Sequence, residues 1–265
     1  MTEKEYREYP AINRSALFKI TESPEKFKYY MDNPEEPTPS LLFGQLFHTM
    51  ALQPEKLSED FAVAPTVDRR TKDGKLAYSQ FLNDNEGKVI IDENTLKTAE
   101  EMCEALQRNS FVKKLFAGEK ETPFFWVDEM TGEQCKCRTD VITEIDGTNI
   151  IVDLKSADNA ETEAFTRSAL KYGYDVQAAM YTEGVQKNTG KKYIFVFVVI
   201  EKKPPYAINI LQADELLMRR GYDIFRELIG IYHDCKQTNN WYGYLGRYNM
   251  INNLALPSYL AKEIE

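Results

Sequence analysis

The segment from Gln134 to Lys155 constrains the fold more than any other part of the sequence. Residues from Gln134 to Ile145 alternate in character, which is typical of a strand with two different faces. Asp146-Gly147 is the signal of a tight hairpin turn. The run from Asn149 to Lys155 (NIIVDLK) is β-branched and fits a buried central strand. The segment therefore predicts an antiparallel hairpin at the centre of a sheet.

Helical patterns surround this hairpin. Ser40 is a candidate N-cap for an apolar helix to Leu52, and residues 65–88 read as a loop or a mobile helical excursion. Further helices are expected over 93–108, 160–171, 174–187 and 213–236, and further strands over 122–127, 193–201 and 206–212. The order predicts an α/β fold, with a central mixed β-sheet flanked by helices and an N-terminal helical region. We expect one domain over 1–265, with a mainly helical part (1–118), a core (119–237) and a C-terminal tail (238–265).

Composition limits where the chain works and how it binds. No segment approaches 18 uninterrupted apolar residues, and the N-terminus lacks a secretory signal, so we expect no membrane span and a cytoplasmic location. The four cysteines are expected to be reduced thiols. The net charge of −9 argues against a protein that coats DNA by bulk charge, although it permits a local basic surface.

Two carboxylates and one lysine carry the chemistry of the hairpin. Asp153 and Lys155 lie two apart on one strand and share a face, and pairing about the turn brings Asp140 opposite Asp153 to within a residue or two. Carboxylates that close repel unless a cation lies between them, and hard oxygen ligands suit Mg²⁺ or Mn²⁺. The alternative is a surface hairpin that carries ordinary charges.

Three side chains outside the hairpin add to this pattern. Gln177 and Tyr181 are four apart on one face of a predicted helix. His48 lies on the early apolar helix, one turn after Gly44, which leaves room for another chain segment. Taken alone, a histidine on an apolar helix is more often a core residue than a ligand. His233 matches no pattern and is predicted to be structural.

The ordered set Arg138-Thr139-Asp140, Asp153-Leu154-Lys155 and Gln177-x-x-x-Tyr181 resembles the RecB-type branch of the PD-(D/E)XK nucleases. The segments INRSALFKITESPEKFKYY and SLLFGQLFHTMALQPEKL resemble the RecE-type (exodeoxyribonuclease VIII-like) exonucleases of phages and prophages. The resemblance covers roughly residues 11–235 and implies that the core (119–237) is a nuclease core.

The resemblance implies a role for each matching residue. Asp140, Asp153, the Leu154 backbone carbonyl and His48 would bind the metal. Lys155 would orient or deprotonate the attacking water. Gln177 and Tyr181 would position DNA or buttress the site.

Two charged residues near this set have open roles. Glu121 precedes the strand at 122–127 and is either a further metal ligand or an exposed residue at a strand start. Arg138 shares a face with Asp140, so it either holds a DNA phosphate or forms a structural ion pair.

The function implied by the resemblance is Mg²⁺-dependent digestion of double-stranded DNA from an end. It implies 5′→3′ polarity, a 3′ single strand passed to a RecT-type annealing protein, a phage or prophage origin, and a homo-oligomeric ring of three or four subunits. The tail aromatics, Trp241, Tyr242, Tyr244 and Tyr248, would bury against a neighbouring subunit or fold back on their own domain. Alternatives are an endonuclease or single-strand nuclease of the same fold, or a catalytically silent DNA-binding module. The chain lacks the late cysteine cluster of iron–sulfur relatives and the glycine loop of nucleotide-driven motors, so neither an iron–sulfur cluster nor a bound nucleotide is implied.

Overall fold

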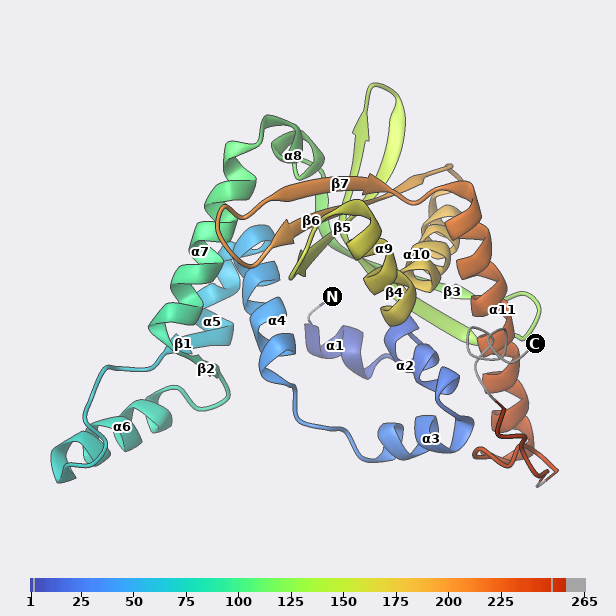
Figure 1. The fold of residues 1–265 in the computed structure, drawn as a ribbon, viewed down its shortest axis with the longest axis horizontal. Coiled ribbons are helices and arrows are strands. Elements are labelled where there is room, and N and C mark those ends of the chain that lie inside the picture. Colours follow the sequence, from blue (N-terminus) through green and yellow to red (C-terminus); the bar gives the residue numbers. More distant parts are fainter. Residues whose placement is uncertain (2, 249, 256–265) are drawn as a thin grey trace.

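A five-stranded sheet forms the centre of the computed structural model, which describes residues 1, 3–248 and 250–255 (Figure 1). Its order is β3 (Glu119–Val127), β4 (Gln134–Ile145), β5 (Thr148–Ala157), β6 (Ile194–Glu201) and β7 (Ile208–Gln212). Strands β5 and β6 are parallel and the other neighbours are antiparallel. The mixed sheet predicted from the sequence is confirmed. The end of the predicted tail, residues 256–265, lies outside the described residues.

The central hairpin follows from its turn residues. Asp146 and Gly147 both have positive φ angles, 49° and 79°, as the two-residue turn that matches strand twist requires. The β4–β5 ladder then runs from Ile145 back to the Val141–Val152 pair. One step beyond that pair, Asp140 lies opposite Asp153, in agreement with the sequence prediction.

Helices cover both faces of the sheet (Figure 1). The helices before the sheet are α1 (Glu3–Glu8), α2 (Arg14–Phe18), α3 (Pro24–Asp32), α4 (Pro39–Leu52), α5 (Leu57–Asp60), α6 (Lys72–Asp84), α7 (Glu93–Arg108) and α8 (Ser110–Leu115), with short 3-10 turns at Lys19–Thr21 and Pro54–Lys56. The later helices are α9 (Thr162–Tyr172), α10 (Tyr174–Thr189) and α11 (Glu215–Thr238). Helix α6 follows β1 (Phe61–Val63) and precedes β2 (Val89–Ile91) in the sequence, and these two short strands pair in parallel. The helix projects from the body (Figure 1), so of the loop and the helical excursion expected over 65–88 the structure shows the helix.

Alternate residues of β5 enter two different cores. Val152 packs with residues of α4, α7 and α8, whereas Ile151 packs with Phe165 of α9 and Ala178 of α10. Each large apolar side chain buried in this way contributes about 1.5–3 kcal/mol. Among the described residues, no helix is both long and apolar enough to cross a membrane.

Two local expectations are corrected. Helix α4 is capped by Thr38, whose hydroxyl accepts a hydrogen bond from the Leu41 N–H at 3.3 Å, and not by Ser40. Pro39 takes the first helical position, where a missing N–H costs nothing. Strand β3 also begins three residues earlier than expected, at Glu119.

The aromatic tail folds back on its own domain. The Trp241 ring stacks on Phe27 of α3, with ring centroids 5.4 Å apart. The Tyr242 carbonyl accepts a hydrogen bond from the Glu25 N–H at 3.1 Å. The tail was expected either to bury against a neighbouring subunit or to fold back on its own domain, and these contacts favour folding back. Tyr248, in contrast, is 82% exposed.

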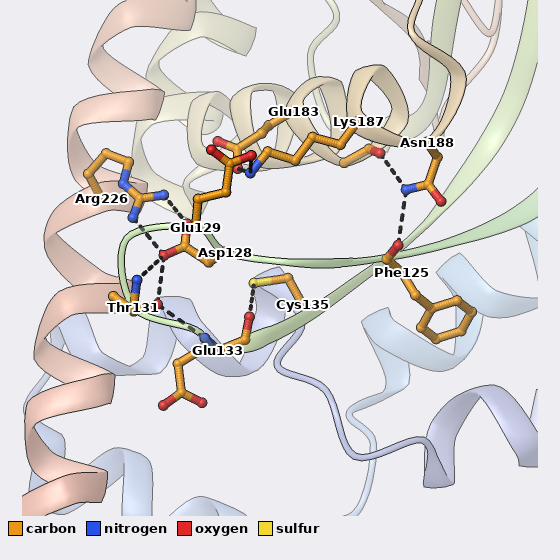
Figure 2. A network of polar contacts seen from close by, with 11 residues as sticks. Phe125, Asp128, Glu129, Thr131, Glu133, Cys135, Glu183, Lys187, Asn188 and Arg226 are labelled. Atoms are coloured by element: carbon orange, nitrogen blue, oxygen red, sulfur yellow. Dashed lines mark hydrogen bonds and ion pairs between the residues drawn. The ribbon is translucent and has the colours of Figure 1, made fainter.

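A buried ion pair ties α11 to the turn between β3 and β4 (Figure 2). Asp128 is 1% exposed, and its carboxylate accepts hydrogen bonds from the Arg226 guanidinium and from the Thr131 N–H and hydroxyl. Burial opposes ionisation of Asp128, but these donors outweigh it and lower the pKa to about 2. Nearby, Glu133 lies 3.0 Å from His233 Nδ1, which agrees with a structural role for this histidine.

Removal of Asp128 should destabilise the fold. We expect Asp128→Ala to lower the free energy of unfolding by about 3 kcal/mol, because the half-buried Arg226 guanidinium would lose its carboxylate partner. The neighbouring Glu129 is 84% exposed, so Glu129→Ala should change the free energy of unfolding by less than about 0.5 kcal/mol. Urea denaturation at pH 7 measures both values.

The same pair predicts a pH dependence. The folded pKa of Asp128 lies below the unfolded value of about 3.9, so its ionisation stabilises the fold above that pH and the contribution is lost as the pH falls through about 2. The stability difference between the wild type and Asp128→Ala should therefore shrink as the pH falls from about 4 towards 2. A constant difference over this range would contradict the assignment.

Candidate active site

Three carboxylates lie at one level of the sheet, on three adjacent strands. The β3–β4 register places Glu121 opposite Asp140, and the β4–β5 register continued by one step places Asp153 opposite Asp140. Glu121 has a φ of +51°, which is sparsely populated for a residue with a Cβ. Such strained conformations cluster at functional sites. The two antiparallel ladders therefore gather acidic groups that are up to 32 residues apart in sequence.

Helix α4 brings a histidine to this acidic row. His48 Nδ1 lies 3.6 Å from Asp140 Oδ2. His48, Glu121 and Asp140 each offer a ligand atom, and these atoms all lie within 4.8 Å of one another. Atoms that bind one divalent ion at about 2.0–2.4 Å lie at most about twice that distance apart. The spacing and the mixture of carboxylate oxygens with an imidazole nitrogen therefore fit a single metal ion.

Asp153 is held from two sides. Lys155 Nζ lies 2.6 Å from Asp153 Oδ2, and the Gln177 side chain of α10 donates a hydrogen bond to Oδ1. Asp153 is 2% exposed, and its Oδ2 accepts no hydrogen bond besides the ion-pair contact. An oxygen with spare acceptor capacity beside the acidic row also fits a metal site. Gln177 therefore buttresses the site from within the fold, and Tyr181, one turn later, packs between two apolar clusters.

Asp140 lies between His48 on α4 and the strand that carries Asp153 and Lys155. Its Oδ2 accepts a hydrogen bond from the Leu154 N–H at 2.7 Å, which fixes the carboxylate between His48 and β5. The Leu154 carbonyl stays a predicted ligand. On the side of Gly44 where a side chain would lie, no further chain segment is near, because a Cβ built there would meet no heavy atom of the described residues within 4 Å. The space that the sequence predicts next to Gly44 is present but faces no neighbouring segment.

Negative charge is in excess here. Burial, and then repulsion from Asp140, raise the pKa of Glu121 to about 8. Burial also raises the pKa of Asp153, and Asp140 adds to this against the opposing effect of Lys155. For Lys155, burial disfavours the ammonium form, but Asp153 and Asp140 outweigh it and raise the pKa. A divalent cation among these carboxylates would relieve their repulsion.

Arg138 supplies part of the missing positive charge. Its Nε lies 2.8 Å from Glu121 Oε2, and its guanidinium lies over the Tyr6 ring at 5.2 Å. Of the two alternatives from the sequence, the structure shows the ion pair, and a contact with DNA phosphate stays a prediction. Glu121 is 13% exposed along its side chain and belongs to the acidic row, so it is not an exposed residue at a strand start.

Two residues that sequence reasoning missed border the site. The Tyr174 ring lies 4.7 Å from Lys155 Nζ, and the Arg14 guanidinium lies 5.8 Å from the same ring. Tyr174 is three residues before Gln177 on α10, so helical spacing alone places both on one side of the helix. No pattern in the sequence indicates Arg14, because both of its hydrogen-bond acceptors lie more than 150 residues away.

This arrangement can be compared with known proteins. The profile of the family described as "PDDEXK-like domain of unknown function (DUF3799)" matches residues 14–253. The chain belongs to this PDDEXK-like family. The match includes every residue of the acidic row, Lys155 and Gln177. The PD-(D/E)XK nuclease fold predicted from the sequence is thereby confirmed for the PDDEXK-like chain.

One solved structure supports the same fold. The crystal structure of a protein from Eubacterium rectale named "Putative exonuclease" aligns with a TM-score of 0.65 and 16% identity, over 99% of this chain and 97% of that chain. At this identity the likeness shows the fold alone. A second structure, that of SSO0001, has a TM-score of 0.31 and 17% identity over 71% of this chain and 86% of that chain, which is too low to carry an argument. No curated protein sequence matches the PDDEXK-like chain.

The donor set predicts opposite effects of one substitution with and without metal. Without metal, Asp140→Asn should leave the melting temperature unchanged or raise it, because the substitution removes the charge repulsion between Asp140 and Glu121. With saturating Mn²⁺, the wild type should melt a few degrees higher and Asp140→Asn should lose that rise. Thermal unfolding in Mn²⁺ and in a chelator measures both effects.

Asp146→Asn is the matched control. It removes one negative charge from the same hairpin, but at the exposed turn. This control should keep the full rise in melting temperature with Mn²⁺. If Asp140→Asn also kept it, Asp140 would not be a metal ligand.

Proposed function

We propose that this chain is a Mg²⁺-dependent exodeoxyribonuclease that digests linear double-stranded DNA from an end in the 5′→3′ direction. The observation that carries the proposal is the position of the buried Asp153–Lys155 pair beside the His48, Glu121 and Asp140 cluster. The RecE-type resemblance supplies the polarity and the duplex substrate. A family profile and a shared fold support nuclease chemistry in general.

Each residue of the site has a physical task in this proposal. His48, Glu121 and Asp140 would hold the metal, and Asp153 Oδ2 would add a further oxygen. A bound Mg²⁺ or Mn²⁺ supplies Lewis acidity toward a phosphodiester oxygen and toward water. Lys155 holds the attacking water in line and stabilises the negative charge that develops on the phosphate.

The remaining residues keep the reacting groups in place. Gln177 fixes Asp153 by its hydrogen bond, so that the carboxylate keeps its second oxygen toward the site. Arg138, beside Glu121, is placed to contact a neighbouring phosphate once another cation shares that carboxylate. A catalytically silent binding module does not need a buried carboxylate–lysine pair, which costs free energy to desolvate.

One assay tests activity, direction and substrate together. Linear duplex DNA labelled at either end, with a circular duplex as the control, should show Mg²⁺-dependent loss of label from the 5′ end only. Cleavage of the circle would favour the endonuclease alternative, and digestion of single strands alone would favour the single-strand nuclease.

Loss of Lys155 should abolish this activity. We expect Lys155→Ala to lower the digestion rate by about 10²–10⁴-fold, because the water and the developing charge lose their partner. Lys203→Ala, at an exposed position, is the control and should digest as the wild type does. A folded Lys155→Ala protein with wild-type Mg²⁺-dependent cleavage would contradict the proposed mechanism.

We also propose that the chain assembles as a ring of three or four subunits and passes its 3′ strand to a RecT-type annealing protein. A net charge of −9 leaves little bulk charge to hold a polyanion, so enclosure of the DNA would keep the enzyme bound. Light scattering at micromolar concentration should give the mass of three or four chains. A monomer that digests long duplexes processively would exclude the ring.

A further inference from the structure

The junction between α9 and α10 sets the direction of the helix that contacts Asp153. Helix α9 ends at Tyr172, and Gly173 has a φ of +66°, in the left-handed region. Helix α10 begins at the next residue, and the Gln177 N–H donates to the Gly173 carbonyl at 3.1 Å. Any shift of this junction would therefore move Gln177 relative to Asp153.

Helix α2 holds the junction from one side. Arg14 Nε donates a hydrogen bond to the Gly173 carbonyl at 3.1 Å, and Arg14 Nη2 donates one to the Tyr172 carbonyl. A guanidinium at a helix C-terminus satisfies carbonyls that the helix leaves without partners. A Cβ on Gly173 would lie 2.3 Å from Phe18 Cε2, so the Phe18 side chain at the end of α2 packs directly on the Gly173 backbone.

Helix α11 holds the junction from another side. Asp175, in the first turn of α10, is fully buried and pairs with the Arg220 guanidinium. A Cβ on Gly221 would lie 2.0 Å from the Asp175 carbonyl oxygen, so the two backbones are in close contact. Since α2 and α11 both contact it directly, the junction is fixed relative to the sheet.

The junction places Tyr174, the first residue of α10, beside Lys155. Its ring lies 4.7 Å from Lys155 Nζ and packs beside Phe165 and Phe197. Phe197 is the β6 partner of Asp153 in the sheet register. The ring is therefore held by apolar neighbours and gives the Lys155 ammonium a second neighbour besides Asp153.

We propose that Arg14 and Tyr174 are positioning residues for Lys155. Arg14 fixes the α9–α10 junction, the junction fixes the Tyr174 ring, and the ring confines the Lys155 ammonium beside Asp153. The inference rests on the proposed function, in which Lys155 acts on water and phosphate. It adds that α2, which is remote in sequence, sets the geometry of the lysine.

Kinetics on linear duplex DNA give the first test. Tyr174→Leu should lower kcat roughly tenfold while KM stays within about twofold, because the lysine and not the DNA is misplaced. Tyr174→Phe keeps the ring and should recover most of this loss. Arg14→Gln should lower kcat as Tyr174→Leu does, and Arg14→Lys should give an intermediate kcat. Arg167→Gln, on the exposed side of α9, is the matched control and should keep the wild-type kcat.

Chemical labelling gives a test that does not depend on nuclease activity. Lys155 is 16% exposed along its side chain, so its amine should react slowly with an acetylating N-hydroxysuccinimide ester, as read by peptide mass spectrometry. Labelling should be several-fold faster in Tyr174→Leu and in Arg14→Gln, and close to wild type in Tyr174→Phe and Arg167→Gln. A wild-type protein without nuclease activity would refute the proposed function, and these labelling ratios would still decide whether the two residues confine Lys155.

Two outcomes would overturn the inference. Wild-type labelling of Lys155 in folded Tyr174→Leu and Arg14→Gln would show that neither residue confines the lysine. A rise in KM at unchanged kcat would show that the residues bind DNA instead. If Tyr174→Leu does not fold, as judged by its thermal melt, Arg14→Gln decides, because it leaves the apolar packing around the ring in place.

Discussion

Asp153 is a carboxylate buried at the centre of a sheet, and the structure around it is organised by the need to compensate that burial. An isolated buried carboxylate costs several kcal/mol. Lys155 on the same strand and Gln177 on α10 supply one partner for each oxygen. To place Gln177, α10 must start at one position and in one direction. The contacts of α2 and α11 with the α9–α10 junction therefore follow from the same requirement.

The hairpin could be predicted almost completely because its signals are local. Asp146 and Gly147 both adopt the left-handed φ that their residue types tolerate, and the turn then fixes the register that sets Asp140 opposite Asp153. Helix α7 was equally predictable: Asp92 and Asn109 flank a strongly amphipathic stretch and bound it at Glu93 and Arg108. Where a boundary depended on a choice between neighbouring caps, as with Thr38 and Ser40, sequence could not decide it.

The site was predictable in part. Asp140, Asp153 and Lys155 come from one hairpin, so the spacing of the chain already limits where they lie. Glu121 was ambiguous because its place in the row depends on the β3–β4 register and on an unusual φ, and neither is visible in the residue type. The role of Arg14 at the site could not be predicted, since its hydrogen-bond acceptors are two backbone carbonyls more than 150 residues away. Contacts to backbone leave no trace in the identity of the partner residue.

The two ends of β3 show what distinguishes a structural carboxylate from a functional one. At one end, Asp128 is buried with as many donors as its oxygens can accept, and its pKa falls to about 2. Toward the other end, Glu121 is buried beside Asp140 with a single guanidinium, and its pKa rises to about 8. Both residues are acidic, Glu121 lies in β3 and Asp128 directly follows it, and burial penalises the ionised form of both. If the acidic row served only to stabilise the fold, the second environment would be as well compensated as the first. At Glu121 the carboxylates are left with an excess of negative charge, and His48, Glu121 and Asp140 offer ligand atoms within 4.8 Å of one another, so this environment fits a site for a divalent cation.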